Sequence, residues 1–425
     1  MVQTRRDFLK TLGIASLGMA VASCRVGAAD RLPRDFKTPN RTPGDLAADE
    51  SYWAGIRDLY ELSDEFINIE SGYYSPAVQS TIEAQIKQLR RVNKEASRYM
   101  RGVRVDEFKA AKAKLAALAG CSPDEITITR NSTEALNTII LGLKLEAGEE
   151  LIYSDLEYPS MVQAIEMRAK RYGTPIRQFD IPNVPSTKEE VIEACRKAIG
   201  PKTKVMLISH MVFLNGLVPP IREICDLCHE RGVEVIVDGA HAFAHVDWKV
   251  PDLHCDYYGT SLHKWLGSPL GTGMLYIKKE KIPRVWPLYA EMEKGDDSIE
   301  KFERTGTRPP HSYIGMEEAI RVHEAIGGKN KEARLRYLKN SWVSRVKELP
   351  RVKILSPITD DMSCAICSFS IEGMDPKDLA DALMNRYGVF VAGLKSEYGV
   401  RVCPNLYTKP EHLDRLVMAI RELAV

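Results

Sequence analysis

The sequence has no excess of charge of either sign, no internal repeat and no low-complexity tract. Its 59 Lys and Arg residues balance 58 Asp and Glu residues, which leaves a net charge of only +1. A chain so balanced has no bulk electrostatic attraction to nucleic acid, and we expect no nucleic-acid partner. Beyond its first residues it also has no apolar run long enough for a transmembrane helix. Hydrophobic residues make up 44% of its 425 positions, which excludes wholesale disorder.

The N-terminus carries the pattern of an export signal. A leader that contains Arg5 and Arg6 precedes an uncharged apolar stretch, Leu12–Ala22, which is too short for a stable membrane span. Paired arginines followed by Phe-Leu-Lys resemble a twin-arginine signal, which exports proteins that have already folded. A merely basic Sec leader is the alternative. We therefore predict a signal peptide over residues 1–28 and a periplasmic location.

Two cleavage points compete in this leader. Val21-Ala22-Ser23-Cys24 resembles a lipobox, which would make Cys24 the lipid-anchored first residue of a lipoprotein. The segment 26–28 offers an ordinary cleavage site of the small-x-small type. The sequence leaves both open, and the only membrane contact that it predicts is through a lipid at Cys24.

Nine cysteines are present, mostly inside apolar runs, where buried thiols are the default in a chain of this length. Cys225-x-x-Cys228-His229 matches the attachment motif of c-type haem, so an exported haem or redox protein is an alternative function. This motif falls in 220–232, whose pattern predicts an amphipathic helix with a glycine stop. The other C-x-x-C pair falls in a strand-like run, where its spacing directs the two thiols to opposite faces, and no metal site is predicted.

Short apolar runs alternate with helical patterns through the middle of the chain. The predicted strands are 126–129, 150–154, 176–179, 204–208, 233–237, 257–260 and 272–277. This alternation favours an α/β fold with a mostly parallel sheet covered by helices on both faces. Helical periodicity precedes it over 51–66 and over 76–119, with a break near Gly102.

The order of elements changes near residue 320, after which it becomes α+β. We therefore predict an N-terminal arm over 29–65, a large domain over 66–320 and a smaller α+β C-terminal domain over 321–425.

Residues with complementary chemistry follow four of the predicted strands. Asp238 follows five apolar residues, where an acid is costly to bury unless a cation meets it. Lys264 follows another strand, among small, hydroxyl and aromatic residues. Ser132 and Thr133 open a helix, whose free backbone N–H groups suit a phosphate, and Tyr158 adds an aromatic ring. Ligands of open α/β sheets bind beyond the carboxyl ends of the strands, so we expect these residues to meet there.

One cofactor would use all of these groups. Pyridoxal phosphate needs a lysine for its Schiff base, a carboxylate that keeps the ring nitrogen protonated, a phosphate site and usually a ring stacked on the pyridine. The residues thus predict a pyridoxal-phosphate enzyme in which Lys264 also moves the Cα proton of the substrate.

Two short motifs make a family resemblance specific. Asp238-Gly-Ala-His241 and Ser261-Leu-His-Lys264 look like the fold-type I, class V aminotransferase family, and the similarity spans roughly residues 65–425. Its members include cysteine desulfurases, kynureninase and an isopenicillin-N-epimerase-like group. The resemblance implies a Schiff base at Lys264, a pairing of Asp238 with the pyridine nitrogen, and His241 facing the 3-hydroxyl of the cofactor.

The same resemblance implies further roles. The phosphate would be held by Ser132, Thr133, Ser261 and His263. Tyr158 would stack on the cofactor. Thr307, in a Gly-Thr-Arg-Pro segment, matches a position that reaches the phosphate of a neighbouring subunit, which implies a homodimer. Arg401 matches the arginine that clamps the substrate α-carboxylate, a role that suits the bidentate fork of a guanidinium.

The sequence departs from the desulfurases at one point. They carry a reactive cysteine on a loop ahead of the clamping arginine, whereas Val391–Gly399 contains none and Cys403 follows the arginine. A cysteine desulfurase-like lyase is therefore disfavoured, although it stays an alternative. The segments Glu-Tyr-Pro at Glu157, Gly-Thr-Arg-Pro and Arg-Val-x-Pro look most like the isopenicillin-N-epimerase-like branch.

We predict an enzyme that acts at Cα of an amino acid or a derivative by transamination, epimerisation or β-elimination. All three reactions begin with loss of the Cα proton and differ in the fate of the resulting carbanion. Weaker candidates for the substrate side are Glu70, Tyr73, Tyr74 and Arg308.

Overall fold

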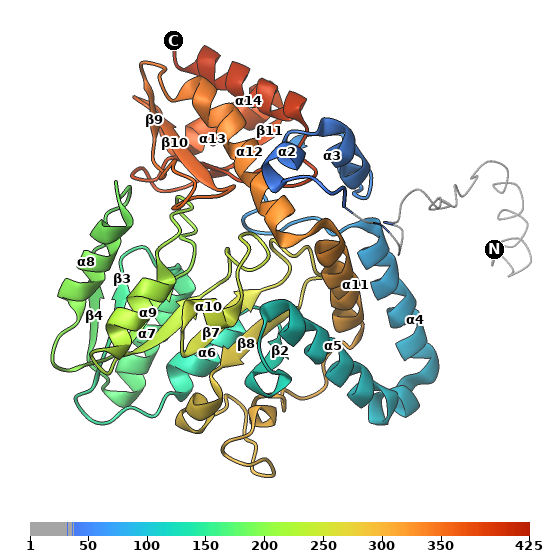
Figure 1. Ribbon diagram of the computed structural model, residues 1–425, viewed down its shortest axis with the longest axis vertical. Coiled ribbons are helices and arrows are strands. Elements are labelled where there is room, and N and C mark those ends of the chain that lie inside the picture. Colours follow the sequence, from blue (N-terminus) through green and yellow to red (C-terminus); the bar gives the residue numbers. More distant parts are fainter. Residues whose placement is uncertain (1–31, 33–35, 37) are drawn as a thin grey trace, which may run out of the picture.

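The computed structural model describes residues 32, 36 and 38–425 (Figure 1). The predicted signal peptide, its two cleavage points and Cys24 lie outside the described residues. Within them, no helix combines the length and the apolar character that a bilayer span requires.

The main sheet places its strands in the order β2-β8-β7-β6-β5-β3-β4. Their bounds are β2 Ile126–Thr129, β3 Glu150–Ser154, β4 Ile176–Phe179, β5 Thr203–Ser209, β6 Glu234–Asp238, β7 Tyr257–Ser261 and β8 Gly273–Ile277. Neighbouring strands from β7 to β4 are parallel, and only β8 runs against its neighbours β2 and β7. The predicted α/β class with a mostly parallel sheet is confirmed.

Helices cover both faces of this sheet. Their bounds are α5 Val103–Ala119, α6 Ser132–Gly142, α7 Pro159–Tyr172, α8 Lys188–Ala198, α9 Ile221–His229, α10 Val250–Leu253 and α11 His311–Ile326. Along β6, Val235 and Val237 face the core shared with α5, α8 and α9, whereas Ile236 faces the core shared with α6 and α7. A strand with helices on both sides buries every side chain, which explains its continuous apolar run.

A second, smaller sheet lies above the main sheet in Figure 1, next to α13 and α14. Its antiparallel strands are β12 Ala392–Gly393, β13 Val400–Val402, β10 Cys367–Ile371 and β9 Val352–Ile354. Helices α12 Gly328–Val346, α13 Pro376–Tyr387 and α14 Pro410–Leu423 accompany it, and β1 Ile67–Asn68 pairs with β11 Val389–Phe390. Residue 320 falls inside α11, and the chain turns toward this sheet only at Gly327, whose φ is 88°.

The N-terminal part of the described chain packs on α12. It forms α2 Pro43–Ala47 and α3 Glu50–Arg57, and Arg334 of α12 donates to the carbonyl of Ala47. The helix expected over 51–66 ends earlier than predicted, at Arg57. In the segment beyond Arg57 the backbone N–H of Glu65 bonds to the Ser63 hydroxyl, a local bond that competes with helix formation.

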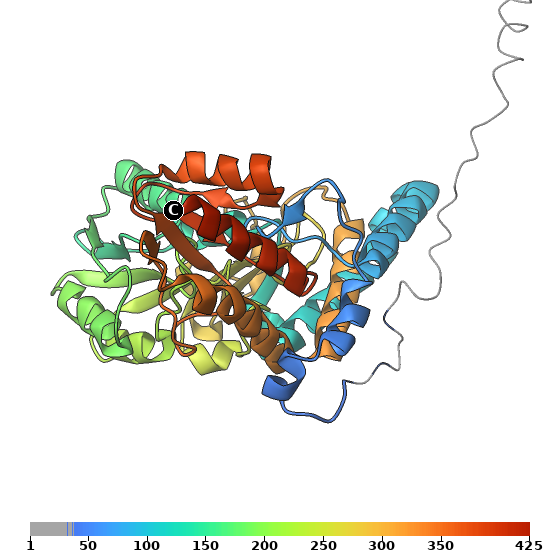
Figure 2. The same ribbon diagram turned by 90° about the horizontal axis from the view of Figure 1, so that it is seen from above.

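The helical pattern over 76–119 is divided as expected. Helix α4, Gln79–Arg101, ends at Gly102, and α5 follows directly. Figure 2 shows α4 extending away from the body of the molecule. Three short 3₁₀ helices complete the described chain: η2 Pro123–Glu125, η3 Lys279–Arg284 and η4 Ile299–Phe302.

Candidate active site

The register of the main sheet brings the carboxyl ends of its central strands together. Ser209 of β5 pairs with Asp238 of β6, and Asp238 pairs with Gly259 of β7. Gly273 of β8 lies opposite both Ser261 and Thr129, so the carboxyl ends of β7 and β2 lie at the same level on either side of β8. A Cβ on Gly273 would lie only 2.6 Å from the Asn131 backbone. A glycine at this position therefore leaves room for the turn that leads into α6.

A cavity of about 380 Å³ opens at these strand ends. Its lining includes these residues predicted from the sequence: Ser132, Thr133, Tyr158, Asp238, His241, Ser261, His263 and Lys264. Tyr73 and Tyr74 also line it. The volume lies within the ~300–1,000 Å³ typical of small-molecule sites.

Asp238 lines the cavity, and no cation among the described residues is in ion-pair contact with it. The side chain is buried, and its Oδ1 accepts a hydrogen bond from the backbone N–H of Ala240 at 2.9 Å. Burial raises the pKa of this carboxyl, although the Ala240 bond and the charge of Lys264 act in the opposite direction. A buried carboxylate of this kind is suited to a cationic ligand atom.

Lys264 and His241 face each other in the same cavity. The Nζ of Lys264 lies 3.0 Å from the Nε2 of His241, and burial lowers the pKa of Lys264 to about 8. Burial also holds the pKa of His241 well below its usual value, with further lowering by Lys264. The neutral imidazole has a buried Nδ1 without a partner in the described chain.

Tyr158 lines the cavity near Lys264. Its ring centroid lies 5.8 Å from the Nζ of Lys264, and its ring meets Phe213 edge to face at 5.0 Å. Tyr158 is the N-cap of α7, whose first residue is Pro159. The contact with Phe213 fixes the orientation of the ring over the cavity.

Another part of the cavity lining consists of hydroxyl groups and a helix N-terminus. The backbone N–H of Ser132 donates to the Ser261 hydroxyl at 2.9 Å, and that hydroxyl donates to the hydroxyl of Ser132 at 2.9 Å. Asn131 caps α6 by accepting from the N–H of Glu134. His263 adds a buried Nδ1 without a partner among the described residues. Such an arrangement suits an anion such as a phosphate group.

These features together fit pyridoxal phosphate. The cavity lining combines a carboxylate with no ion pair among the described residues, a lysine amine with a lowered pKa, an aromatic ring and a group of donors suited to an anion. The orphaned ring nitrogens of His241 and His263 need polar partners, which the cofactor's oxygens would provide.

Three of the remaining candidates lie elsewhere or are engaged. Thr307 is exposed and does not line the cavity. Arg308 donates to the carbonyl of Ile128 at 2.6 Å and lies over the Phe108 ring, so it does not reach the substrate side. Arg401 is buried beside the cavity, but its guanidinium is ion-paired with Glu70 at 2.6 Å.

Sequence reasoning missed a group of lining residues at the end of β5 and just beyond it. Ser209, Met211 and Phe213 line the cavity, and their signal was the same as for Asp238, since they follow a buried parallel strand. Beneath them, Glu157 accepts hydrogen bonds from the hydroxyls of Ser154 and Ser209, both at 2.6 Å. Burial raises the pKa of Glu157 to about 8, so this position favours a neutral acid near neutral pH.

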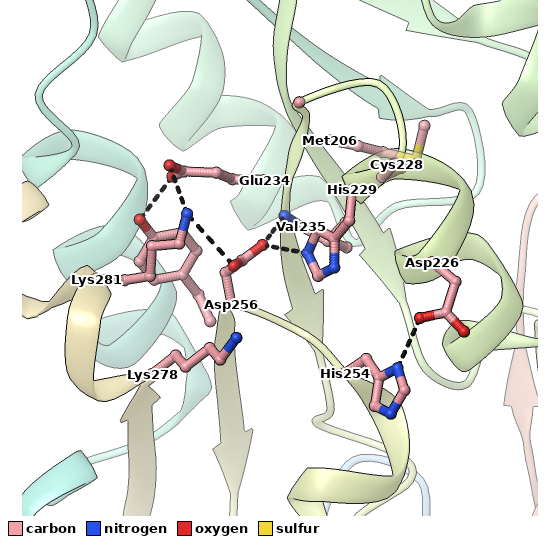
Figure 3. A network of polar contacts seen from close by, with 12 residues as sticks. Met206, Asp226, Cys228, His229, Glu234, Val235, His254, Asp256, Lys278 and Lys281 are labelled. Carbon is pink, nitrogen blue, oxygen red and sulfur yellow. Dashed lines mark hydrogen bonds and ion pairs between the residues drawn. The ribbon is translucent and has the colours of Figure 1, made fainter.

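The Cys-x-x-Cys-His motif lies in α9, and none of its residues lines the cavity. Figure 3 shows Cys228 and His229 of this motif. Cys225 and Cys228 are each 0% exposed, and the Nε2 of His229 lies 2.9 Å from Asp256. Thiols packed in a core cannot bond to a haem without unfolding the helix, so the structure does not support the haem alternative. Nor do three or more metal-binding side chains cluster anywhere in the described part of the chain.

Comparisons with known proteins identify the family of this chain. The family model for aminotransferase class-V matches residues 74–415. An isopenicillin N epimerase of Streptomyces clavuligerus is 28% identical over 390 residues, which cover 87% of this chain and 98% of that protein. A probable cysteine desulfurase of Halalkalibacterium halodurans is 28% identical over 358 residues, which cover 77% of this chain and 84% of that protein.

Solved structures share the fold. The apo structure of a cysteine desulfurase from Thermococcus onnurineus has a TM-score of 0.78 at 21% identity and covers 91% of this chain and 99% of that chain. A structure of the protein C-DES with glycine covalently linked to its PLP cofactor has a TM-score of 0.76 at 20% identity. It covers 91% of this chain and 100% of that chain.

Proposed function

This chain belongs to the class-V aminotransferase family, and on that premise we propose that Lys264 removes the Cα proton of an amino acid or of an amino-acid derivative. The family match confirms the expectation of an enzyme that uses pyridoxal phosphate. The observation that carries the proposal is the meeting of Lys264, His241 and Asp238 in one cavity.

Each of these three residues has a separate part in the proposed reaction. Once bound, the cofactor supplies a sink for the electron pair that the departing proton leaves behind. Asp238 holds a proton on the ring nitrogen, a role supported by its burial without an ion pair. Lys264 moves the proton at Cα, a role supported by a pKa that burial lowers to about 8. His241, 3.0 Å away, positions the amine.

The remaining lining residues are proposed to bind and orient the cofactor. The phosphate binds at the N-terminus of α6, where Ser132, Thr133, Ser261 and His263 supply donors. Tyr158 packs on the ring and excludes water from that face, which its fixed contact with Phe213 supports.

Desulfuration is the weaker candidate. None of the cysteines in the described chain lines the cavity, and Cys403 is 0% exposed. Burial also raises the pKa of Cys403 well above its usual value, so its thiol is a poor nucleophile. The proposal therefore covers epimerisation, transamination and elimination without a cysteine carrier.

The experiment is an absorption spectrum of the purified protein with pyridoxal phosphate, repeated while single L- and D-amino acids are added. We expect a visible band that borohydride bleaches and that is absent in Lys264→Ala. Lys339→Met is the matched control, because Lys339 is also buried but donates to Ser363 and does not line the cavity. A protein with no band even in excess cofactor would refute the proposal.

The fate of the substrate then identifies the reaction. Exchange of the Cα proton with solvent deuterium and loss of optical activity would indicate epimerisation. Release of a keto acid together with the amine form of the cofactor would indicate transamination, and release of a side-chain fragment would indicate elimination.

We also propose export by the twin-arginine route and assembly as a homodimer. Export rests on Arg5, Arg6 and the apolar stretch that follows, and the exposure of Thr307 is compatible with a contact to a second subunit. Cell fractionation of wild type and of a variant with both arginines changed to lysine tests the first proposal. Light scattering of the purified protein tests the second.

A further inference from the structure

Glu70 and Arg401 form a buried ion pair beside the cavity. The Nη2 of Arg401 donates to Oε1 of Glu70 at 2.6 Å, and its Nε donates to Oε2 at 3.2 Å. The two side chains are only 5% and 7% exposed. The third nitrogen, Nη1, donates to the carbonyl of Phe213 at 2.7 Å. Every nitrogen of the guanidinium therefore has a partner within the chain.

The pair lies directly behind the wall of the cavity. Phe213 and Tyr73 line the cavity, and both contact the pair, since the backbone N–H of Tyr73 donates to Oε1 of Glu70 at 3.0 Å. Its charges also reach Lys264. Burial is the main cause of the lowered pKa of Lys264, and Arg401 lowers that pKa further whereas Glu70 raises it.

The backbone holds Glu70 in this place. The N–H of Cys403 donates to the carbonyl of Ile69 at 2.8 Å, and the N–H of Ser71 donates to the carbonyl of Cys403 at 3.2 Å. A Cβ on Gly72 would lie 2.9 Å from both Glu70 and Arg401, so the chain there fits closely around the pair. These backbone contacts therefore place the carboxylate of Glu70 next to Arg401.

This ion pair changes how well the cavity can bind the carboxylate of a ligand. An unpaired buried arginine would attract a carboxylate strongly, because its fork binds both oxygens at once. Here the Nε–Nη2 edge already holds a carboxylate, and the pair is neutral as a whole. A second carboxylate would approach the charge of Glu70 and would have to lose its water without gaining an unpaired cation.

We propose that Glu70 competes with a substrate carboxylate for Arg401, so that the cavity selects amino compounds whose reacting carbon bears an uncharged group. An amide or an ester of an amino acid has this chemistry. The inference rests on the proposed function, since it takes the Lys264 cavity as the substrate site. It makes Glu70 a specificity-determining residue, and it replaces the role that the family resemblance implied for Arg401.

The test compares amino acids with their primary amides, in which an uncharged group replaces the carboxylate next to the reacting carbon. Cofactor-loaded wild type and Glu70→Gln are titrated with alanine and alaninamide, serine and serinamide, and the dissociation constants are read from the visible band. In wild type we expect the amides to bind at least about tenfold more tightly than the acids. In Glu70→Gln we expect the acids to gain at least about tenfold, with the amides unchanged.

Two results would overturn the inference. Wild type that prefers the acids would show that Arg401 is available to them. Weaker or unchanged acid binding in Glu70→Gln would show that Glu70 positions Arg401 for a substrate carboxylate or has no influence on it. If Glu70→Gln does not fold, the acid-to-amide ratio of wild type decides alone.

A matched control is Glu50→Gln. It removes the carboxylate from another buried arginine, Arg334, whose partner lies 2.5 Å away and far from the cavity lining. We expect its acid-to-amide ratio to equal that of wild type. A protein that forms no visible band at all refutes the proposed function, whereas a band with an unfavourable ratio refutes only the competition by Glu70.

Discussion

Strand β6 has a cluster of ionisable groups at each end, and the two clusters differ in how completely they are paired. At its N-terminal end, Asp256 accepts from the N–H of Val235 at 2.8 Å and lies 2.9 Å from the Nε2 of His229 (Figure 3). Lys281 donates to Glu234 at 3.0 Å in the same cluster. Every charge there has an opposite charge in contact.

At the C-terminal end of the same strand, the ionisable groups keep hydrogen-bonding capacity that a ligand can satisfy. Asp238 accepts one backbone N–H and has no ion pair among the described residues, and the Nδ1 of His241 has no partner there. The paired cluster carries the more conspicuous sequence motif, yet its groups are already satisfied. Between the two ends of β6, unmet hydrogen-bonding capacity, rather than the density of reactive residues, therefore distinguishes the candidate active site from the paired cluster.

The largest effect is expected from Asp238→Asn. The variant loses the charge opposite the cofactor ring, and turnover should fall by about 10²–10⁴-fold. Its free energy of unfolding should stay the same or rise, because the carboxylate is buried without an ion pair. Steady-state kinetics and urea denaturation measure the two quantities. Turnover within twofold of wild type would place the acid outside the chemistry.

The matched variant at the other end of the strand is Asp256→Asn. It removes the charge that His229 and Lys281 face, and the free energy of unfolding should fall by about 1–3 kcal/mol with turnover per folded molecule unchanged. Urea denaturation at pH 7 measures the loss. Impaired turnover in a stable variant would contradict the assignment of this cluster to stability.

The pH dependence of that loss has a defined sign. Burial tends to raise the pKa of Asp256, but hydrogen bonds from His229 and Val235 outweigh it, and the pKa lies below its usual value of 3.8. A carboxyl with a lowered folded-state pKa contributes stability above its unfolded pKa and loses it as the pH falls through the folded value. The difference between wild type and Asp256→Asn should therefore shrink below about pH 4.

The parts of this site that were predictable from sequence are those set by local pattern. Asp238 was predictable because it ends a continuous apolar run, and Lys264 because it closely follows the next predicted strand along the chain. Phe213 was missed although it follows β5 in the same way. The strand itself is evident from its apolar run, but Met211 and Phe213 beyond it carry no charge that would mark them as site residues.

The pairing of Glu70 with Arg401 was not predictable in this way. The two residues are separated by 331 positions, and neither flanking sequence encodes the contact. It depends on the bridge between Glu70 and Cys403, which forms only when the chain before α4 meets the smaller sheet. The fold class follows from local periodicity, whereas the ion pair beside the cavity follows from tertiary contacts.

A smaller effect concerns the pH at which the free protein captures its cofactor. Only the unprotonated amine of Lys264 reacts, and burial lowers the pKa of Lys264 to about 8. The rate of covalent capture should rise about tenfold per pH unit below that value and level off above it. Stopped-flow absorption at constant ionic strength follows the reaction. A rate that still rises steeply beyond pH 9 would show an ordinary, hydrated lysine.

The smallest effect is expected in the Cys-x-x-Cys-His motif of α9. Cys228→Ala removes a sulfur that touches Met206 at 3.8 Å in the core, and it should cost about 1 kcal/mol of stability while cofactor binding and turnover stay within twofold. Burial raises the pKa of Cys228 to about 12, so a thiol reagent at pH 8 should label this residue only after denaturation. Rapid labelling of the native protein, or loss of the visible cofactor band in the alanine variant, would mean that the two ends of β6 are coupled. The paired cluster would then belong to the function, and satisfied hydrogen bonds would no longer separate it from the site around Asp238.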